Sequence, residues 1–396
     1  MRNLHLPIWL GELNQPRQPT FAILFGSVAV CRTIMLTVLP LQVHALLGDV
    51  QNVSLLYFAV SLVGLCGSLT VPVLVAQFKR RWVFTAGACS AVAAAALIGT
   101  GGFLPLILGM MFQVFSITAM EITLNLYVMD HVPRRELGRF EPMRIFTGAG
   151  VWTIGPWLGV FLKTEISPMA PYFISAVFAV ISMGYFWVLR FKDDVAVQPM
   201  KRRPVNPVRF IKRFFSQPRL VLAWCLALGR SGWWSMFFIY APIFAVESGL
   251  GENLSGMIIS FGMACVFAVP LWGALGRRWG YRKLLLVGYG LAGCMTIGVA
   301  ILFSAPWLAV ITLVLSALAA TLIDGAGNIP FLRAVHPYER PEMTAVFSTY
   351  RDVGQMAPPA VFSVLLRSFD LWAVFAAGGC GMIVLAWFSR HIPRRL

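Results

Sequence analysis

Charged residues are scarce in this 396-residue sequence. Lys, Arg, Asp and Glu together make up 12% of it, whereas 58% of the residues are hydrophobic and the mean hydropathy is +0.76. Soluble globular proteins carry about 25% charged residues, because these side chains cover the surface that meets water. The missing polar surface excludes an ordinary soluble protein and predicts lipid as the solvent.

Several short motifs are also absent. The seven cysteines show no CxxC or Cys/His spacing, so we predict no metal site or disulfide framework and expect all seven to be small core residues. There is no GxxxxGK[ST] loop, which argues against ATP as an energy source, and we predict no cofactor. No His/Asp or Ser/His cluster stands at a membrane face, which argues against an integral membrane enzyme. Residues 1–20 do not resemble a cleavable signal peptide, so the first apolar run is expected to remain in the mature protein.

Twelve segments are apolar and long enough to cross a membrane, which takes about 20 residues of helix. They predict an all-α polytopic membrane protein with twelve transmembrane helices in two pseudo-symmetric six-helix bundles. The expected domains are a cytoplasmic segment 1–20, a first bundle 21–191, a basic linker 192–218, a second bundle 219–389 and a tail 390–396. The expected spans are 21–47, 51–78, 82–101, 103–130, 140–163, 169–191, 219–246, 253–276, 282–303, 305–333, 343–367 and 370–389.

The positions of the basic residues predict the orientation. There are 32 Lys and Arg against 16 Asp and Glu, and twenty-six of the 32 fall on the cytoplasmic side if the N-terminus is inside. Only Lys163 and Arg367 fall on the outer side of the membrane. Because Lys and Arg concentrate in cytoplasmic loops, we predict a plasma (inner) membrane protein with both termini cytoplasmic. Topology thus accounts for the net charge of +16, and we predict no nucleic-acid partner.

The two halves of the sequence repeat each other, even at charged positions inside the expected spans. Membrane-embedded charges are rare, so matched pairs of them indicate a common architecture rather than coincidence. The matches are Arg32-Thr33 with Arg230-Ser231 and Val71-Pro72 with Val269-Pro270 at an offset of 198, Glu121 and Asn125 with Asp324 and Asn328 at 203, and Arg144 with Arg351 at 207.

Two local motifs complete a resemblance to a known family. The segment from Gly273 to Lys283 has a Gly, a basic pair, a second Gly and a second basic pair, although Arg277 stands where the family's motif has Asp. Gly155-Pro156 resembles the Gly-Pro signature of proton antiporters in the same family. With the two six-helix repeats, these motifs make the sequence similar to the major facilitator superfamily. The residues expected to act in gating are Gly273, Arg278, Gly280, Arg282 and Lys283, with Arg144, Arg351, Gly155 and Pro156.

The resemblance implies that the charged residues of the first, fourth, seventh and tenth helices face a central cavity. Those residues are Arg32, Glu121, Arg230 and Asp324, and they also permit a simpler interpretation in which Arg32 pairs with Glu121 and Arg230 with Asp324 only to hold helices together. We expect substrate contacts from Arg32, Arg230, Asn125, Asn328, Trp233 and Trp234. A carboxyl group beside an arginine can be ionised or protonated, so Glu121, Asp324 and, less directly, Asp352 are the expected proton carriers.

These features predict a secondary active transporter that works by alternating access. Away from the ends of the spans there are four arginines and three acidic residues, and this balance favours a small anionic or zwitterionic organic substrate. The expected partners are this small molecule, protons and membrane lipid, and we expect a monomer. Export by proton antiport is favoured over import by symport. Lipid or lysolipid translocation and a non-transporting membrane sensor remain the alternatives.

Overall fold

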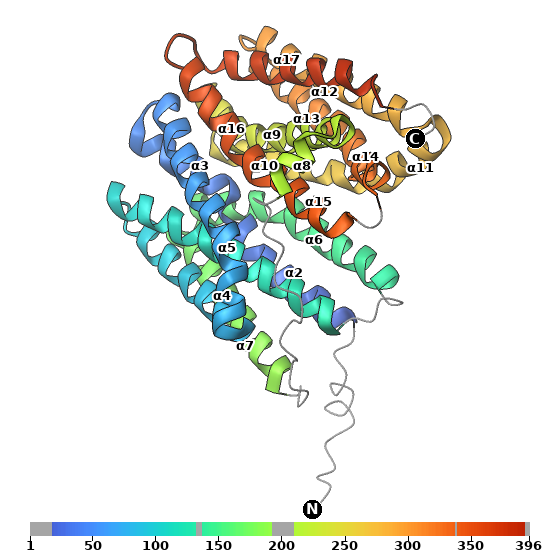
Figure 1. Ribbon diagram of the computed structural model, residues 1–396. Helices are drawn as coiled ribbons and strands as arrows, with labels where there is room; N and C mark the ends of the chain where they lie inside the picture. The colour runs from blue at the N-terminus through green and yellow to red at the C-terminus, as the bar shows by residue number, and fades with distance from the viewer. Residues whose placement is uncertain (1–17, 132–136, 192–209, 337–338, 393–396) are drawn as a thin grey trace, which may run out of the picture. The chain divides into compact units, whose positions relative to one another are not determined.

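The computed structural model describes residues 18–131, 137–191, 210–336 and 339–392. Within these ranges every regular element is helical, as the composition predicts (Figure 1). In the described part of the chain, nine helical stretches are long and apolar enough to cross a membrane. The predicted spans 140–163, 219–246 and 343–367 are not among them; they carry Arg144, Arg230 and Arg351, and the helix of the last span is interrupted at 348–349.

The described residues of the first half form six α-helices and one π-helical turn. The predicted spans 51–78 and 82–101 are not separated by a helix end, because α4 is helical from Val50 to Gly99, although its segments Val50–Val75 and Arg80–Gly99 are each long and apolar enough to cross a membrane. Lys and Arg favour helix, and no Gly or Pro lies between Val73 and Ala86, so the local sequence gives the helix no reason to end there. The elements are α2 (Gln18–Thr33), α3 (Met35–Leu47), α4 (Val50–Gly99), α5 (Phe103–His131), α6 (Leu137–Phe161), η2 (Leu162–Ile166) and α7 (Ala170–Phe191).

The first predicted span is divided at Ile34, between α2 and α3. Gly159 of α6 packs against this point, where a Cβ would lie 2.0 Å from the Ile34 carbonyl oxygen. Just before the break, the Cys31 carbonyl accepts hydrogen bonds from Gln113 Nε2 (3.2 Å) and Ser175 Oγ (3.0 Å). Side chains from neighbouring helices thus supply partners to the backbone where a helix in lipid is interrupted.

The second half contains similar breaks, and two of them lie beside predicted site residues. The span 305–333 is divided at Gly327, which has a φ of +53° and follows Asp324 by three residues. The span 343–367 is divided at 348–349, directly before Tyr350 and Arg351. The elements are α8 (Ile211–Phe215), α9 (Pro218–Glu247), α10 (Glu252–Ala264), η4 (Cys265–Ala268), α11 (Val269–Trp279), α12 (Tyr281–Ile301), α13 (Pro306–Ala326), α14 (Ile329–Ala334), α15 (Arg340–Phe347), α16 (Tyr350–Leu365) and α17 (Trp372–Ser389).

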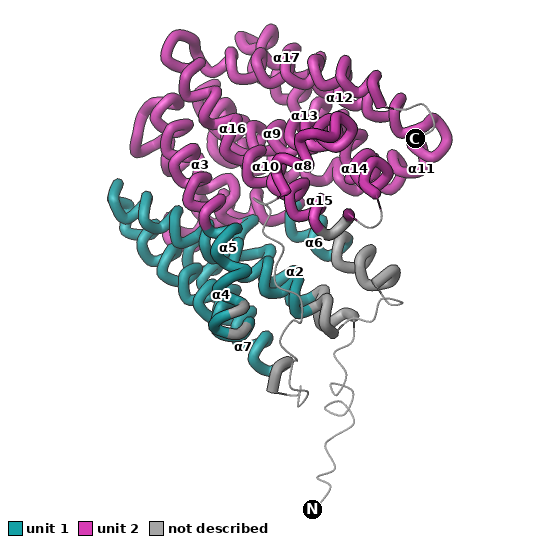
Figure 2. The backbone as a smooth tube through the Cα atoms, in the orientation of Figure 1, with its two compact units in different colours: residues 1–33, 67–152, 172–203 teal, residues 34–66, 153–171, 204–396 magenta. Residues whose placement is uncertain are grey.

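The chain divides into two compact units, coloured separately in Figure 2. Unit 1 comprises 1–33, 67–152 and 172–203, and unit 2 comprises 34–66, 153–171 and 204–396. Residues 34–66 and 153–171, which belong to the first half of the sequence, therefore pack with the second half. Most of the predicted linker, 192–209, lies outside the described residues, and α8 forms in the part that follows.

Each unit has its own tightly packed interior. In unit 1 the rings of Phe84 and Phe186 stack with centroids 4.2 Å apart, inside a buried cluster that also contains Met120. In unit 2, α12 packs against both α13 and α17. A Cβ on Gly293 would lie 2.9 Å from the carbonyl oxygen of Gly379, so small residues let α12 and α17 approach closely.

The cysteine prediction is only partly right. Cys31 is buried, and Cys225 and Cys265 are intermediate. The side chains of Cys66, Cys89, Cys294 and Cys380 are exposed. In lipid an apolar side chain has no need of burial in protein, so an apolar sequence context does not distinguish core from surface.

Candidate functional site

In unit 1, the charged side chains of α2 and α5 face each other. Arg32 Nη1 lies 3.9 Å from Glu121 Oε2, and the two side chains are 31% and 49% exposed. The Arg32 guanidinium also lies over the Trp152 ring of α6, 4.9 Å from its centroid. This separation exceeds the usual 2.7–3.2 Å, so Arg32 and Glu121 are not hydrogen-bonded to each other. Within the described residues, neither side chain makes another hydrogen bond.

In unit 2, the matching pair joins α9 to α13 and is more enclosed. Arg230 Nε lies 3.6 Å from Asp324 Oδ1, and the side chains are 13% and 24% exposed. The other Asp324 oxygen accepts a hydrogen bond from the indole N–H of Trp234 at 3.1 Å. Arg230 Nη2 also donates to Asn328 Oδ1 at 3.2 Å. Each charge of this pair therefore has a partner beyond the other.

Tyr350 is a member of the site that sequence reasoning missed. Its hydroxyl oxygen accepts from Arg230 Nη2 at 3.2 Å and from Arg351 Nε at 3.3 Å. Both guanidinium groups lie 5.8 Å from the centroid of its ring. The only signal in the sequence was its place next to Arg351, at a helix start that no pattern indicated. Trp152, the ring over Arg32, was missed as well.

The remaining predicted contacts fall in different surroundings. Trp233 is buried and donates its indole N–H to Thr296 at 3.0 Å, whereas Trp234 faces Asp324. Asn125 is partly buried one turn after Glu121 in α5, and Asp352 is partly buried beside the exposed Arg351. Arg144 lies in α6, but its side chain is outside the described part of the structure.

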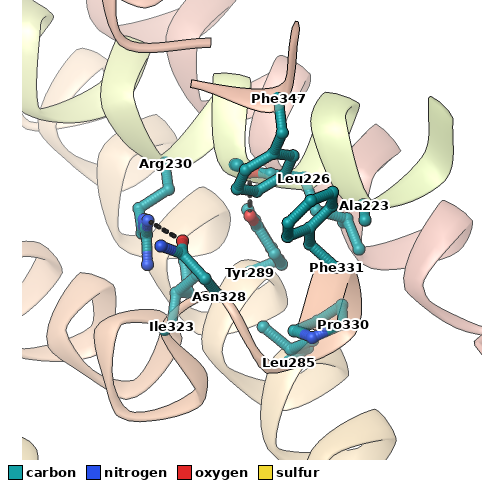
Figure 3. A pocket seen from close by; sticks show the side chains of 12 residues that line it. Ala223, Leu226, Arg230, Leu285, Tyr289, Ile323, Asn328, Pro330, Phe331 and Phe347 are labelled. Atoms are coloured by element: carbon teal, nitrogen blue, oxygen red, sulfur yellow. Dashed lines mark hydrogen bonds between the residues drawn. The ribbon is translucent and has the colours of Figure 1, made fainter. Parts of the chain in front are cut away.

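A small cavity lies beside Arg230 and has room for about one water molecule (Figure 3). Arg230 and Asn328 line it, joined by their hydrogen bond, together with Tyr289, whose hydroxyl donates to the Leu226 carbonyl. Its remaining walls are mostly apolar, including the rings of Phe331 and Phe347. This space is too small for an organic substrate in the conformation that the structure shows.

The predicted gating loop forms the connection between α11 and α12. Gly280 has a φ of +85°, a conformation that favours glycine, and it ends α11 just before α12 begins. Gly273 is half-buried in α11, and a Cβ on it would lie 3.7 Å from the Gly325 carbonyl oxygen of α13. The basic residues of the motif differ in exposure: Arg278 and Lys283 are exposed and Arg282 is intermediate.

Gly155 and Pro156 are both buried in α6, where this helix packs against α10 within unit 2. A Cβ on Gly256 of α10 would lie 3.2 Å from the Pro156 carbonyl oxygen. The Trp157 backbone N–H donates to Ser260 Oγ at 3.0 Å. This close helix crossing gives the Gly-Pro pair a packing role.

Directly after α6, the π-helical turn η2 pairs with the start of α10 through residues that sequence reasoning did not single out for a site. Lys163 Nζ lies 2.7 Å from Glu252 Oε2, and Thr164 donates to Asn253 Oδ1 at 2.8 Å. Lys163 is one of the two basic residues that the topology prediction places outside. These contacts join the first half of the sequence to the second at the end of the helices opposite the basic loops.

The described residues contain no group of three or more His, Cys, Asp or Glu side chains that could hold a metal ion. The site is therefore built from arginine, carboxyl, amide and aromatic groups. Such groups bind charged and polar organic molecules by hydrogen bonds, ion pairs and stacking.

The chain is similar to known transporters in sequence and in fold. The multidrug resistance protein MdtG of Salmonella heidelberg is 24% identical over 285 residues, which are 68% of this chain and 68% of that protein. MdtG of Dickeya zeae is 24% identical over 279 residues, which are 68% of this chain and 67% of that protein.

Two solved structures show the same fold at low sequence identity. A POT family transporter in complex with 5-aminolevulinic acid has a TM-score of 0.77 and 10% identity, covering 93% of this chain and 94% of that one. The nucleoside transporter NupG has a TM-score of 0.71 and 16% identity, covering 95% of this chain and 98% of that one.

The family model described as Major Facilitator Superfamily matches residues 20–359, most of the chain. It agrees with the helical fold and the apolar spans. The resemblance inferred from the repeat and the loop motif is therefore confirmed, and the chain belongs to the major facilitator superfamily.

Proposed function

We propose that this chain, a secondary transporter rather than an enzyme, exports a small anionic or zwitterionic organic solute in exchange for protons. The observation that carries the proposal is the arginine–carboxyl pair inside the spans of both repeats, Arg32 with Glu121 and Arg230 with Asp324. Charges inside a membrane are costly and mark transport pathways. The pairs give the transporter both an anion-binding group and a titratable group.

The arginines support an anionic group on the substrate. A guanidinium presents several N–H donors in one plane, which suits a carboxylate or phosphate. Apart from the first two and last two residues of each span, the predicted spans contain four arginines and three acidic residues, so an anionic or zwitterionic ligand offsets the remaining positive charge.

The carboxyl groups support coupling to protons. When a substrate anion takes the arginine, the neighbouring carboxyl group loses its counter-charge and gains a reason to bind a proton. The substrate and the proton then bind to the same arginine–carboxyl pair, either in competition or together. Asp352 lies next to Arg351 and is the third carboxyl group in this proposal.

The contacts between η2 and α10 support alternating access. The Lys163–Glu252 ion pair and the Thr164–Asn253 hydrogen bond join the two halves of the sequence on the side that the topology prediction places outside the cell. Ser54 and Tyr240 add a third such contact, with their hydroxyl oxygens 2.7 Å apart. A transporter of this kind must break these contacts to open outward.

Two observations favour export. Gly155-Pro156 resembles the signature of antiporters, and two of the relatives named above are multidrug resistance proteins. Orientation in the plasma membrane, with both termini cytoplasmic, follows from the basic loops.

Reconstitution in liposomes tests the proposal. An imposed proton gradient should drive accumulation of an organic anion or zwitterion, and both Glu121→Gln and Asp324→Asn should be assayed for loss of that accumulation with downhill flux retained. If both variants still concentrate the solute, neither carboxyl group couples transport to protons. If no charged solute moves in any gradient, the proposed function is wrong as a whole.

A further inference from the structure

The two matched charge pairs differ in how completely they are satisfied. We propose that they have different functions: Arg32 and Glu121 form the substrate-binding pair and take the two ends of a zwitterion, whereas Arg230 and Asp324 form a fixed structural pair. Of the two matched carboxyl groups in the proposed function, Glu121 is then the one that couples to protons. This inference rests on the proposed transport function and assigns its substrate class and one site.

The Arg32–Glu121 pair is open. Its atoms are 3.9 Å apart, and within the described residues Arg32 donates no hydrogen bond while Glu121 accepts none. A guanidinium has five N–H donors and a carboxylate has about four acceptor positions, so both groups retain nearly their full capacity. In a span, a half-exposed carboxylate must face water rather than lipid. Both groups are therefore available to a solute.

Trp152 orients the open pair. The Arg32 guanidinium carbon lies over its ring, 4.9 Å from the centroid, which is a cation–π contact. This contact restrains Arg32. Within the described residues no hydrogen bond uses the Arg32 N–H donors, so they remain for a carboxylate.

The Arg230–Asp324 pair is closed. Arg230 bonds to Asn328 and Tyr350 in addition to its contact with Asp324, and Asp324 accepts from Trp234. A ligand anion at Arg230 must displace several existing partners, so it gains little. The cavity beside Arg230 has room for only about one water molecule. These contacts connect α9, α13 and α16 and suit a structural role.

A zwitterion fits the open pair better than a singly charged ligand. An anion inserted at Arg32 separates the pair and leaves Glu121 ionised without a partner, and a cation at Glu121 does the same to Arg32. A ligand with both charges replaces both halves of the interaction. A singly charged anion reaches the same balance only if Glu121 first binds a proton, which makes its binding stronger as the pH falls.

Matched ligands separate these cases. The probes are 5-aminolevulinic acid with levulinic acid, which lacks the amine, and its methyl ester, which lacks the anion. The dipeptide Ala-Ala, its N-acetyl form and its methyl ester provide a second set of another length. Binding to the purified full chain is measured by calorimetry at pH 5.5 and pH 7, where the amines of the probes stay charged, with Glu121→Gln, Arg32→Lys and the control Glu342→Gln. Glu342 lies in the first turn of α15, and nothing assigns it to the site.

We expect a zwitterion to bind about ten- to a hundred-fold more tightly than both of its singly charged partners, as the loss of one charge-assisted contact implies. Glu121→Gln should remove the preference over the anion, Arg32→Lys should weaken both, and Glu342→Gln should match the parent. An anion that binds as tightly as the zwitterion, or binds only at the lower pH, overturns the inference but keeps proton-coupled anion transport. Failure of every zwitterion to bind also overturns it, and the liposome assay then decides separately whether the proposed function stands.

Discussion

Neutralising the two matched carboxyl groups should have very different effects on stability. Asp324→Asn leaves the Arg230 charge, only 13% exposed, without its counter-ion inside a span. An unpaired charge near the middle of a membrane costs about 2.5–3.5 kcal/mol on insertion scales. Asn328 and Tyr350 still accept from Arg230, so we expect a net loss at the lower end, about 2–3 kcal/mol.

Glu121→Gln should cost far less. The pair it disrupts is 3.9 Å apart and its side chains are 31% and 49% exposed, so it resembles a solvated ion pair. Such pairs contribute about 0–1 kcal/mol. The expected difference between the two variants is therefore at least about 1 kcal/mol, more than fivefold in the folding equilibrium.

Denaturant and thermal unfolding of the purified variants, followed by tryptophan fluorescence in one detergent, measure this difference. A paired replacement, Arg230→Met with Asp324→Leu, provides the control, because removing both charges restores much of the stability that a single change loses. Equal losses for the two single variants, or a larger loss for Glu121→Gln, would refute the reasoning that one pair is closed and the other open.

Three further predictions concern packing, gating and orientation. Gly159→Ala places a Cβ against the backbone carbonyl of Ile34 and should lower stability by about 1–3 kcal/mol or prevent folding, whereas Gly150→Ala, with open space around it, should unfold at the parent's midpoint. Lys163→Glu should break the ion pair with Glu252 and so raise labelling of the outer face by a membrane-impermeant thiol reagent. Adding Glu252→Lys should reverse the effect, since the exchanged charges re-form the ion pair. A cysteine in place of Val205, in the predicted cytoplasmic linker outside the described residues, should resist that reagent in intact cells lacking the native cysteines; labelling there contradicts the orientation.

The charge pairs could be predicted from the sequence because charges inside apolar spans are rare. Each of Arg32, Glu121, Arg230 and Asp324 is conspicuous in its segment, and the offsets between the two repeats match each of them to its counterpart. The simplest pairing, within each half, is the one that the structure shows. The sequence did not show in this way which other side chains contact the pairs.

The missed features depend on helix rotation and on contacts between distant segments. Trp152 and Tyr350 reach the arginines only because α6 and α16 present those faces, and an apolar sequence in lipid carries no periodicity that fixes the face. The divisions of the first span at Ile34 and of another at Gly327 also escaped prediction. Pro40 and Pro330 are near these points, but proline alone does not say which residue ends a membrane helix.

The difference between the pairs has a physical reason in the work that a transporter performs. If both pairs were closed, the interaction energy that a substrate gained would only replace that of the partners it displaced. Its binding could then not favour one conformation over another. If both were open, neither would contribute more than about 0–1 kcal/mol to the stability of the empty protein. One closed pair stabilises α9, α13 and α16, while the open pair leaves interaction energy for the ligand. A transporter with the same residue types in both halves therefore benefits when one pair stays fixed and the other exchanges its partner for the ligand.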